Sequence, residues 1–490
     1  MTYFKQVSLV FIFIFGGQLI AQENIFLDRE FWSSNPTIKI IDQNIKKGHD
    51  LSQANSNNFD AMVLAILQDV SNETLEYIQS KPGNDVNKLT HDGRTYIFWA
   101  AYKGNVSFME YLLKNGAKTD LTDDKGNTIL NFAAGSGQQN TQVYDLCLAH
   151  GANLEKDLTP NRANALLLAA PFDTDFVLID YFTSKGLSIN SVDAEGNGVF
   201  NYVAKTGNID LLNTLLDKNI KGNDQAFIFA AYGPRGKTIG LEVYKFLETN
   251  GLNPNTKTKD GITPLQIVAT RNKDVAITNY FIEKGADVNH ADKNGNTALL
   301  NAASGNTLEV ITILVKLTKD INWVNTKGES ALSLAVSNNS AKVVGFLIEN
   351  KANVEVVDAN GNHLAYYLLN AFPTNDFQQK VELLKSEDLD ISKIHEDGNT
   401  LYHLAVSKNS LELVKWVSNY KVDINAKNKD GNTALHLAAM GATDTDILKF
   451  LVAQGAKKNE LTEFDETAFN LASENEILLA KKLNFDFLNS

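Results

Sequence analysis

The sequence contains a single cysteine, Cys147, among 490 residues. An internal disulfide therefore cannot hold the folded chain, and its stability must come from packing. Cys147 lies within the apolar run Tyr144–Leu148, whose composition is typical of a buried helix face. We expect this thiol to be a small buried hydrophobic group rather than a reactive nucleophile.

The sequence also lacks the spacings that mark metal and hydrolase sites. No Cys-x-x-Cys or His-x-x-x-His pair occurs, and no serine lies in a Gly-x-Ser-x-Gly turn. The Asp and Glu residues show no sign of a pocket that would shift the pKa of a carboxylate pair. We therefore expect a protein that is not an enzyme and that holds no metal and no cofactor.

Basic residues are in deficit. Lys and Arg number 45 against 58 Asp and Glu, which gives a net charge of -13. An acidic chain lacks the basic face that neutralises phosphates, so we expect no nucleic-acid partner. The acidity favours solubility, and it also suits a basic protein partner; both interpretations remain open.

Long hydrophobic runs are missing outside the N-terminus. There Lys5 precedes the apolar run Val7–Phe15, and the small residue Ala21 marks a cleavage position before Gln22. This order predicts a secretory signal peptide over residues 1–21, because a membrane-spanning helix needs ~20 apolar residues. The segment resembles the signals of Gram-negative exported proteins. We expect an exported, periplasmic protein, with secretion as the alternative, and no stable membrane insertion.

The chain does contain an internal repeat. A turn followed by a small polar residue and an Ala/Leu-rich run recurs along the sequence, and half of the intervals are 33 or 34 residues. The turns lie at Asp60, Gly93, Gly126, Asn161, Gly196, Asn223, Gly261, Gly295, Gly328, Gly361, Gly398, Gly431 and near Glu466. A period of this length predicts stacked units rather than one globular core.

The best-preserved units carry specific motifs. Residues 430–439 read Asp-Gly-Asn-Thr-Ala-Leu-His-Leu-Ala-Ala, residues 294–299 read Asn-Gly-Asn-Thr-Ala-Leu, and one unit contains Thr263-Pro264-Leu265. Recurring in phase, these motifs resemble the ankyrin repeat over roughly residues 38–485. The resemblance implies an all-α solenoid of helix-turn-helix units with β-turn fingers.

Several positions in these units have a physical role. The Asp-Gly and Asn-Gly pairs supply the positive φ of a tight turn. Thr433 can cap the first helix of its repeat, and Pro264 suits the first helical position. Gly285 and Gly455 can end second helices in the left-handed conformation. The family often carries a structural histidine where His403 and His436 stand.

The repeat phase divides the chain into segments. We expect a signal peptide at 1–21, an irregular N-terminal cap at 22–57, the ankyrin repeat array at 58–460 and a C-terminal capping repeat at 461–490. Some repeats are stretched between their two helices, near Ser136–Thr141, Pro171–Asp175, Gly233–Ile239, Phe372–Asp376 and Gly441–Asp446. Insertions on one face of a repeat array often mark its binding face, although tolerated loop drift also explains them.

One segment is similar to a phosphate-binding loop. Residues 231–238 read Ala-Tyr-Gly-Pro-Arg-Gly-Lys-Thr. A working loop of this kind needs a preceding strand and an acidic magnesium partner. The preceding run Ala226–Ala230 falls in phase with the first helix of a repeat, so we expect no nucleotide site.

The resemblance also implies where a partner docks, namely a concave surface lined by the finger turns and the first helices. His290, Trp323 and Val356 stand five residues before successive turn glycines. Exposed Trp, Tyr and Arg side chains are frequent at binding hot spots, although such residues can also fill gaps between neighbouring fingers. The candidate binding residues are Tyr102, Tyr232, Arg271, His290, Trp323 and Val356.

Together these observations predict a protein–protein interaction scaffold in the periplasm. The alternatives are a small-ligand or cofactor-handling protein that uses the concave groove, and a structural component of the envelope. A repeat fold hosts many partners, so the fold indicates a class of function rather than one partner.

Overall fold

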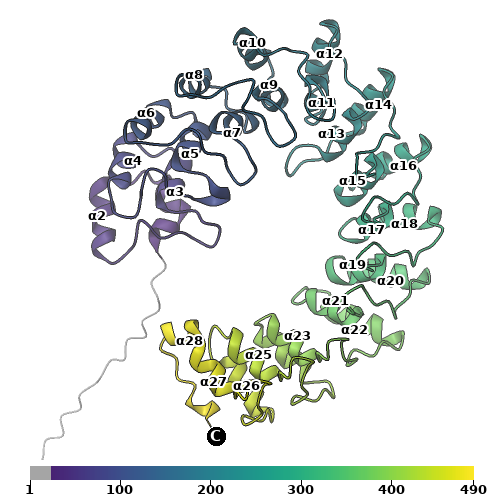
Figure 1. Ribbon diagram of the computed structural model, residues 1–490. Coiled ribbons are helices and arrows are strands. Elements are labelled where there is room, and N and C mark those ends of the chain that lie inside the picture. The colour runs from purple at the N-terminus through teal and green to yellow at the C-terminus, as the bar shows by residue number, and fades with distance from the viewer. Residues whose placement is uncertain (1–23, 490) are drawn as a thin grey trace, which may run out of the picture. The chain divides into compact units, whose positions relative to one another are not determined.

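The computed structural model describes residues 24–489 (Figure 1). The signal peptide expected at residues 1–21 lies outside the described residues. The chain forms two compact units, which divide between Val199 and Phe200. We call residues 24–199 unit 1 and residues 200–489 unit 2.

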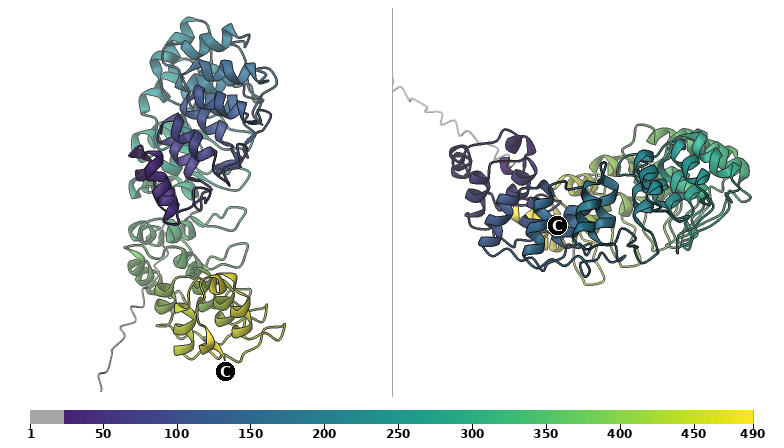
Figure 2. Two further views of the ribbon diagram at one scale, coloured as in Figure 1. Left: turned by 90° about the vertical axis from the view of Figure 1, so that its left-hand side faces the viewer. Right: turned by 90° about the horizontal axis from the view of Figure 1, so that it is seen from above.

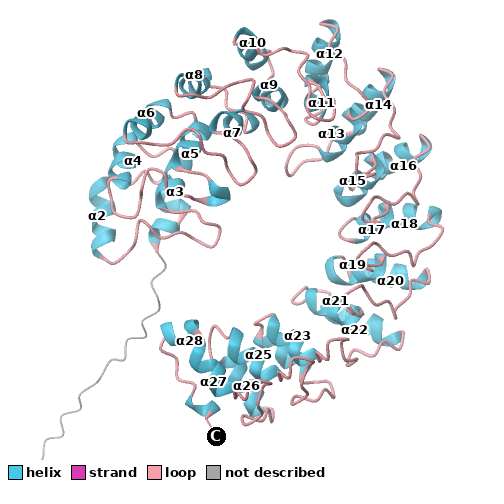
Figure 3. Cartoon of the chain, viewed as in Figure 1, coloured by secondary structure: helices cyan, strands magenta, loops and turns pink. Residues whose placement is uncertain are grey.

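Both units are helical, and the predicted all-α repeat fold is confirmed (Figure 3). The described part of the chain contains isolated β-bridges, such as Val324 with Ser330, but no strand. Unit 1 contains η1 (Ile25–Leu27), α1 (Arg29–Ser33), α2 (Ile38–Lys46), α3 (Ala61–Leu67), α4 (Asn72–Gln79), η2 (His91–Gly93), α5 (Tyr96–Lys103), α6 (Val106–Lys114), α7 (Ile129–Gly135), α8 (Thr141–Ala149), α9 (Ala165–Ala169), η3 (Ala170–Phe172) and α10 (Val177–Ser184).

Unit 2 continues the same alternation of helices from α11 (Val199–Ala204), in which the division falls. It contains α12 (Ile209–Asp217), α13 (Ala226–Tyr232), α14 (Leu241–Thr249), α15 (Pro264–Arg271), α16 (Val275–Glu283), α17 (Ala298–Ala303), α18 (Leu308–Leu317), α19 (Ala331–Asn338), α20 (Ala341–Glu349), α21 (Leu364–Asn370), α22 (Phe377–Ser386), α23 (Leu401–Ser407), α24 (Leu411–Val417), α25 (Ala434–Gly441), α26 (Asp446–Ala453), α27 (Ala468–Glu474), α28 (Glu476–Ala480) and η4 (Asp486–Leu488).

The helix ends follow the local chemistry expected from the sequence. The Thr433 hydroxyl accepts the N–H of His436, and the His436 ring accepts the N–H of Thr433 in return, which forms a capping box at the start of α25. Pro264 is the first residue of α15. Gly285 and Gly455 follow second helices with φ of 87° and 97°, as predicted for left-handed helix ends.

Helices of the same kind stack into rows within each unit. In unit 1 the first helices α3, α5, α7 and α9 pack on one another, as do the second helices α4, α6 and α8 (Figure 1). In unit 2 the first helices from α13 to α27 form one such row. The first helices are buried on most sides, whereas a second helix such as α26 buries only a stripe, Ile447, Leu448 and Leu451.

A loop that we call a finger connects each second helix to the next first helix. The fingers of unit 2 project from the same side of its helices (Figure 2, left). The turn residue of a finger has a positive φ, and glycine usually fills the place. Asn58, Arg162 and Asp465 adopt the same conformation in fingers without that glycine, and Asp60, marked as a turn from the sequence, instead caps α3.

The N-terminal segment expected as an irregular cap contains two helices, α1 and α2. The buried Trp32 stacks on Phe26 and donates its indole N–H to the Phe26 carbonyl at 2.9 Å. Helix α1 packs on the first repeat through α3, and the Tyr77 hydroxyl of α4 donates to the Asp42 carboxylate of α2. This segment thus covers the first repeat with helices.

The stretched connections lie between first and second helices, as the repeat phase predicted; Gly233–Ile239, for example, joins α13 to α14. In other repeats, asparagine side chains link the connection between first and second helix to that of the preceding repeat. Asn306 donates to the carbonyls of Ala269 and Asn272 at 2.8 and 3.0 Å, and Asn339 binds the next connection in the same way. Within residues 24–489, no helix has the length and apolar character needed to cross a bilayer.

Candidate functional site

Neighbouring fingers are joined backbone to backbone. The residue two before a turn glycine donates its N–H to the carbonyl just before the previous turn glycine. Thr326 donates to Asn294 at 2.9 Å and Ala359 to Lys327 at 2.8 Å. The same bond recurs in both units, as Asp124 to Asp92, Ala194 to Asn161, Lys293 to Asp260 and Lys429 to Asp397. The fingers therefore form a regular surface on which side chains at one position line up.

The stacking is close enough to require glycine at a turn. A Cβ atom on Gly328 would lie 2.6 Å from the Ala359 nitrogen, and the backbone there has a φ of 76°. A side chain would thus meet both a backbone clash and a strained conformation.

Asparagine residues tie the bases of several fingers to the next repeat. Asn289 donates to the Leu317 carbonyl and accepts from the Lys319 N–H, at 3.1 and 2.8 Å. Asn322 and Asn425 each make the same pair of bonds with the repeat that follows their own. These fingers are therefore held at their turns by backbone hydrogen bonds and at their bases by asparagine side chains.

The predicted residues His290 and Trp323 make equivalent hydrogen bonds in successive fingers. The His290 ring donates from Nε2 to the Gly261 carbonyl at 2.7 Å, and Trp323 donates its indole N–H to the Gly295 carbonyl at 2.8 Å. Each thus reaches back to the turn glycine of the preceding finger. The Trp323 side chain nevertheless remains 44% exposed, so its ring is both anchored and accessible.

Val356, the third residue predicted at this position, is only partly exposed. Its neighbour Val357 is 46% exposed, and the equivalent residues of the flanking fingers, Val324 and Ile394, are 40% and 60% exposed. Successive residues of an extended finger point to opposite sides, which explains why one position is tied to a neighbour and the next is open. We call Val324, Val357 and Ile394, which stand four residues before their turn glycines, the finger row.

A second set of predicted residues lies earlier in unit 2. Tyr232 ends α13 and is 44% exposed, and Arg271 ends α15 and is exposed. Partial burial raises the pKa of Tyr232, and the positive charge of Arg271 opposes that rise. Lys257, also exposed, occupies the finger-row position of the same repeat as Arg271. This end of the unit 2 surface therefore carries two exposed basic side chains, Lys257 and Arg271, while the charges of Asp260 and Asp292 also act on Tyr232.

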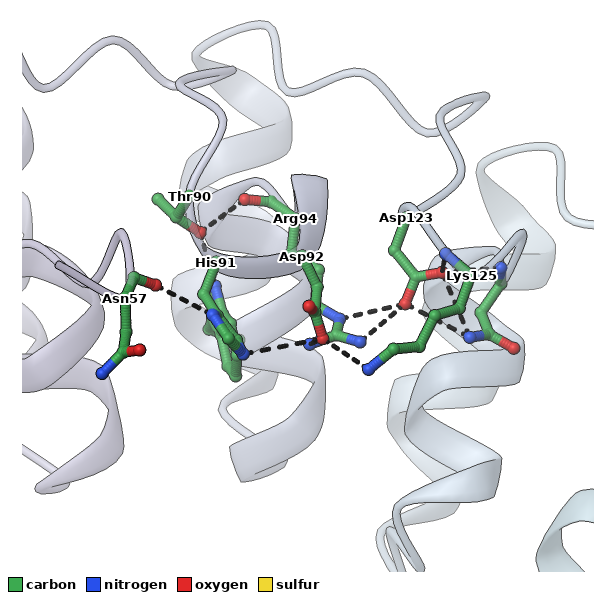
Figure 4. A network of polar contacts seen from close by, with 9 residues as sticks. Asn57, Thr90, His91, Asp92, Arg94, Asp123 and Lys125 are labelled. Carbon is green, nitrogen blue, oxygen red and sulfur yellow. Dashed lines mark hydrogen bonds and ion pairs between the residues drawn. The ribbon is translucent and has the colours of Figure 1, made fainter. Parts of the chain in front are cut away.

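Unit 1 contains a polar network that sequence reasoning missed (Figure 4). The buried Arg94 donates from Nε and Nη2 to Oδ2 of the buried Asp123, at 3.0 and 2.8 Å, and its Nη1 lies 3.1 Å from Asp92. Asp92 in turn binds Lys125, whose hydrogen bond lowers the pKa of the Asp92 carboxyl. His91 binds the Asn57 carbonyl of the preceding finger at 2.8 Å. Only the acidic turn pattern hints at this network in the sequence.

Aromatic rings surround this network. The Arg94 guanidinium lies 4.2 Å from the Phe132 ring centre and 5.3 Å from that of Trp99. Tyr102, predicted as a binding residue, is 40% exposed and stacks on Phe132. Because Arg94 already occupies the aromatic faces, this cluster ties three fingers together and presents chiefly Tyr102 to solvent.

The structure thus groups most of the predicted binding residues in unit 2. His290, Trp323 and Val356 stand at one position of successive fingers, and Tyr232 and Arg271 lie near each other. Tyr102 belongs to unit 1. The finger row was not predicted, although counting one residue further along each finger would have found it.

The cysteine and the two repeat histidines singled out from the sequence lie inside the fold. Burial raises the pKa of Cys147 to about 12, as expected for an inert thiol. The rings of His403 and His436 bind backbone carbonyls at 2.9 Å, which confirms their structural role. Residues 226–232 form helix α13 rather than a strand. The segment similar to a phosphate-binding loop therefore lacks the preceding strand, as the repeat phase predicted. No group of three or more His, Cys, Asp or Glu residues suited to a metal occurs among residues 24–489.

Comparisons with known proteins agree with the repeat architecture. The family model described as "Ankyrin repeats (3 copies)" matches residues 61–156, 227–323, 267–358 and 360–462, more than half of the chain. The putative ankyrin repeat protein FPV230 of Fowlpox virus is 28% identical over 186 residues, which cover 36% of this chain and 93% of the viral protein.

Two transferases are similar to this chain over a smaller part of their own length. The probable palmitoyltransferase AKR2 of Saccharomyces uvarum is 39% identical over 80 residues, 16% of this chain and 11% of the yeast protein. The phosphocholine transferase AnkX of Legionella pneumophila is 24% identical over 244 residues, 48% of this chain and 23% of the bacterial protein. The chain therefore spans less than a quarter of either transferase.

Proposed function

The chain belongs to the ankyrin-repeat family, and on that premise we propose that it is a scaffold that binds a protein partner through its fingers and first helices. Ankyrin repeats are generally protein–protein interaction modules. A stack of repeats presents variable side chains on a constant frame, which suits recognition of an extended surface. The transferase activities are not carried over, because the matches cover only a small part of those proteins.

The observation that carries this proposal is the finger row. Single exposed apolar residues are ordinary on protein surfaces, but Val324, Val357 and Ile394 occupy one position in three successive fingers. Exposed apolar side chains that recur at one position of neighbouring fingers line the same surface, and clustered apolar surface marks interaction sites. Trp323 adds an exposed ring whose orientation is fixed by its bond to Gly295.

A cavity beside Trp323 can receive part of a protein partner. It has a volume of about 270 Å³ and is lined by Trp323, Val288, Leu299 and Leu300, among others. Its largely apolar lining suits an apolar side chain of that partner. The net charge of -13 attracts a basic partner at a distance, whereas Lys257 and Arg271 place exposed positive charge on this part of the surface.

We further propose that the protein acts in the periplasm, on the strength of the signal-like segment at residues 1–21. The test is fractionation of cells that produce the full chain, with sequencing of the mature N-terminus. The proposal expects a periplasmic protein that begins at Gln22. A chain that stays in the cytoplasm with residues 1–21 attached would overturn it.

Partner binding is tested by affinity capture from the periplasmic extract of the source organism. The finger variant Val324→Ser, Val357→Ser, Ile394→Ser is compared with the parent chain. The matched control variant Val275→Ser, Leu317→Ser, Ile477→Ser alters exposed apolar residues of second helices in the same unit. We expect a protein that the parent and the control retain and the folded finger variant loses. Equal retention by all three chains would refute the finger surface as the binding site.

A further inference from the structure

The position that defines the finger row has a charge pattern along unit 2. Reading one residue per finger, it runs Lys257, Ala291, Val324, Val357, Ile394, Lys427 and Leu461. The apolar stretch from Ala291 to Ile394 therefore lies between two lysines. The form of a partner that fits this row follows from its spacing and from the state of the two lysines.

The spacing comes from the stacking of the repeats. Packed helices lie about 8–10 Å apart, and residues at one position of successive fingers recur at the same interval because each finger is fixed to its own repeat. The backbone bonds from Thr326 to Asn294 and from Ala359 to Lys327 keep the fingers in that register. A partner that contacts every finger must present an apolar side chain on one side at about this interval.

A polyproline II segment meets this requirement. It has three residues per turn and rises 3.1 Å per residue, so every third side chain returns to the same side after about 9.3 Å. A β-strand returns to the same side after two residues, or about 6.6–6.8 Å, which misses the interval. An α-helix regains its face after seven residues, about 10.5 Å, but it presents a broad apolar stripe to a row that is one side chain wide.

The two lysines that flank the apolar stretch differ in their contacts. Lys427 is already engaged, since its amine lies 3.3 Å from a Glu460 carboxylate oxygen and donates to the Leu461 carbonyl at 2.8 Å. Lys257 and Arg271 are exposed and form no ion pair among the described residues. Of the two lysines at this position, only Lys257 lacks an ion pair among the described residues, and together with Arg271 it offers positive charge that complements an anionic partner group.

From this spacing and charge we infer that the finger row binds an extended, proline-rich protein segment with an apolar residue at every third position and acidic residues at one end. Its three apolar side chains lie on Val324, Val357 and Ile394. Its acidic residues, about six positions beyond the contact with Val324, lie by Lys257 and Arg271. This inference rests on the proposed function and specifies the partner's form.

Labelled synthetic peptides test the inference by fluorescence anisotropy on the chain from residue 22 onward. The probe has three leucines spaced three apart in a proline-rich background, with two glutamates six residues beyond the last leucine. Control peptides space the leucines two or seven apart, or replace the glutamates with lysines. We expect the probe to bind at least about tenfold more tightly than each control, and the finger variant to lose that binding.

A charge reversal tests the polarity of the row. The variant Lys257→Glu, Arg271→Glu should weaken binding of the glutamate probe by about tenfold and should favour the lysine peptide instead. Both substitutions fall on exposed side chains, so the fold should be retained, which circular dichroism checks. Equal binding of all leucine spacings, tighter binding of the seven-residue spacing, or no binding of any peptide would overturn the inference.

The peptide experiment and the capture experiment can fail independently of each other. If the finger variant loses a captured partner while every peptide fails to bind, the scaffold function stands and the extended form of the partner is wrong. If capture is unaffected by the finger variant, both proposals fail.

Discussion

The indole N–H of Trp323 donates to the Gly295 carbonyl of the preceding finger at 2.8 Å. His290 makes the equivalent bond to Gly261 one repeat earlier. The bond fixes a large ring that remains exposed to solvent, so little side-chain freedom is left to lose when a partner binds. Trp323 thus combines a tie between fingers with a preformed contact surface.

Replacement of Trp323 separates these two roles. Trp323→Phe keeps an aromatic ring but removes the N–H donor, and it should lower the unfolding free energy by about 1 kcal/mol while weakening partner binding severalfold. Trp323→Ala should weaken binding further because the ring is gone. Urea unfolding and the affinity of the captured partner measure the two effects. Parent-like binding by Trp323→Ala would show that the ring is not part of the site.

The close contact at Gly328 predicts a large effect of a small substitution. Gly328→Ala places a Cβ against the Ala359 nitrogen in a left-handed conformation and should destabilise unit 2 by about 2–4 kcal/mol. Gly455→Ala has the same conformational strain without a nearby atom and should cost about 1 kcal/mol. The urea midpoints of the two variants measure the difference. Equal midpoints would mean that the finger contact does not constrain the stack.

The structural histidines predict a pH dependence of stability. Burial lowers the pKa of His403 and His436 below the value of about 6.5 expected in the unfolded chain. The unfolded chain then binds more protons, so the stability is fully present above pH ~6.5 and is lost as the pH falls from there toward the lower folded pKa. Protonation also removes the acceptor with which the His436 ring binds the Thr433 N–H.

Glutamine is the matched replacement, because Gln266 fills the same place in a sister repeat and forms the same capping box. The variant His403→Gln, His436→Gln should match the parent at pH 8 within about 1 kcal/mol and lose less stability between pH 7.5 and 5. Thermal unfolding across that range measures the effect. An unchanged pH profile would assign the dependence to other groups.

The buried ion pair of unit 1 predicts a non-additive pair of substitutions. Arg94→Met leaves the buried Asp123 carboxylate without its partner and should cost about 3–5 kcal/mol. Asp123→Asn alone should also destabilise, and the double variant should cost less than the two single effects combined. Chemical unfolding of unit 1 measures the cycle. Additive effects would show that the network of Figure 4 contributes no coupling.

The sequence predicted most of the repeat frame because each element has a local cause. Thr433, Pro264 and Gly455 set helix starts and ends through capping, fixed φ and left-handed freedom, and these effects act within a few residues. The stretched connections could likewise be placed by counting residues. The helices of the N-terminal cap were missed because that segment carries no repeat motif to count from.

The surface was harder to predict because it depends on contacts between repeats. Trp323 was selected for its type, but its bond to Gly295 joins different repeats and has no local signal. Val356 was selected from the position that faces the neighbouring finger, whereas Val357 faces solvent. Arg94 stands next to a turn glycine like an ordinary surface residue, and only its approach to Asp123 shows that it is buried.

The most direct test of the account is capture from periplasmic extract by the parent chain, the finger variant and the second-helix control variant side by side. We expect the same protein to be retained by the parent and by Val275→Ser, Leu317→Ser, Ile477→Ser, and to be lost by the folded Val324→Ser, Val357→Ser, Ile394→Ser chain. Retention by the finger variant together with loss by the control would contradict binding through the fingers and move the binding site to the second helices.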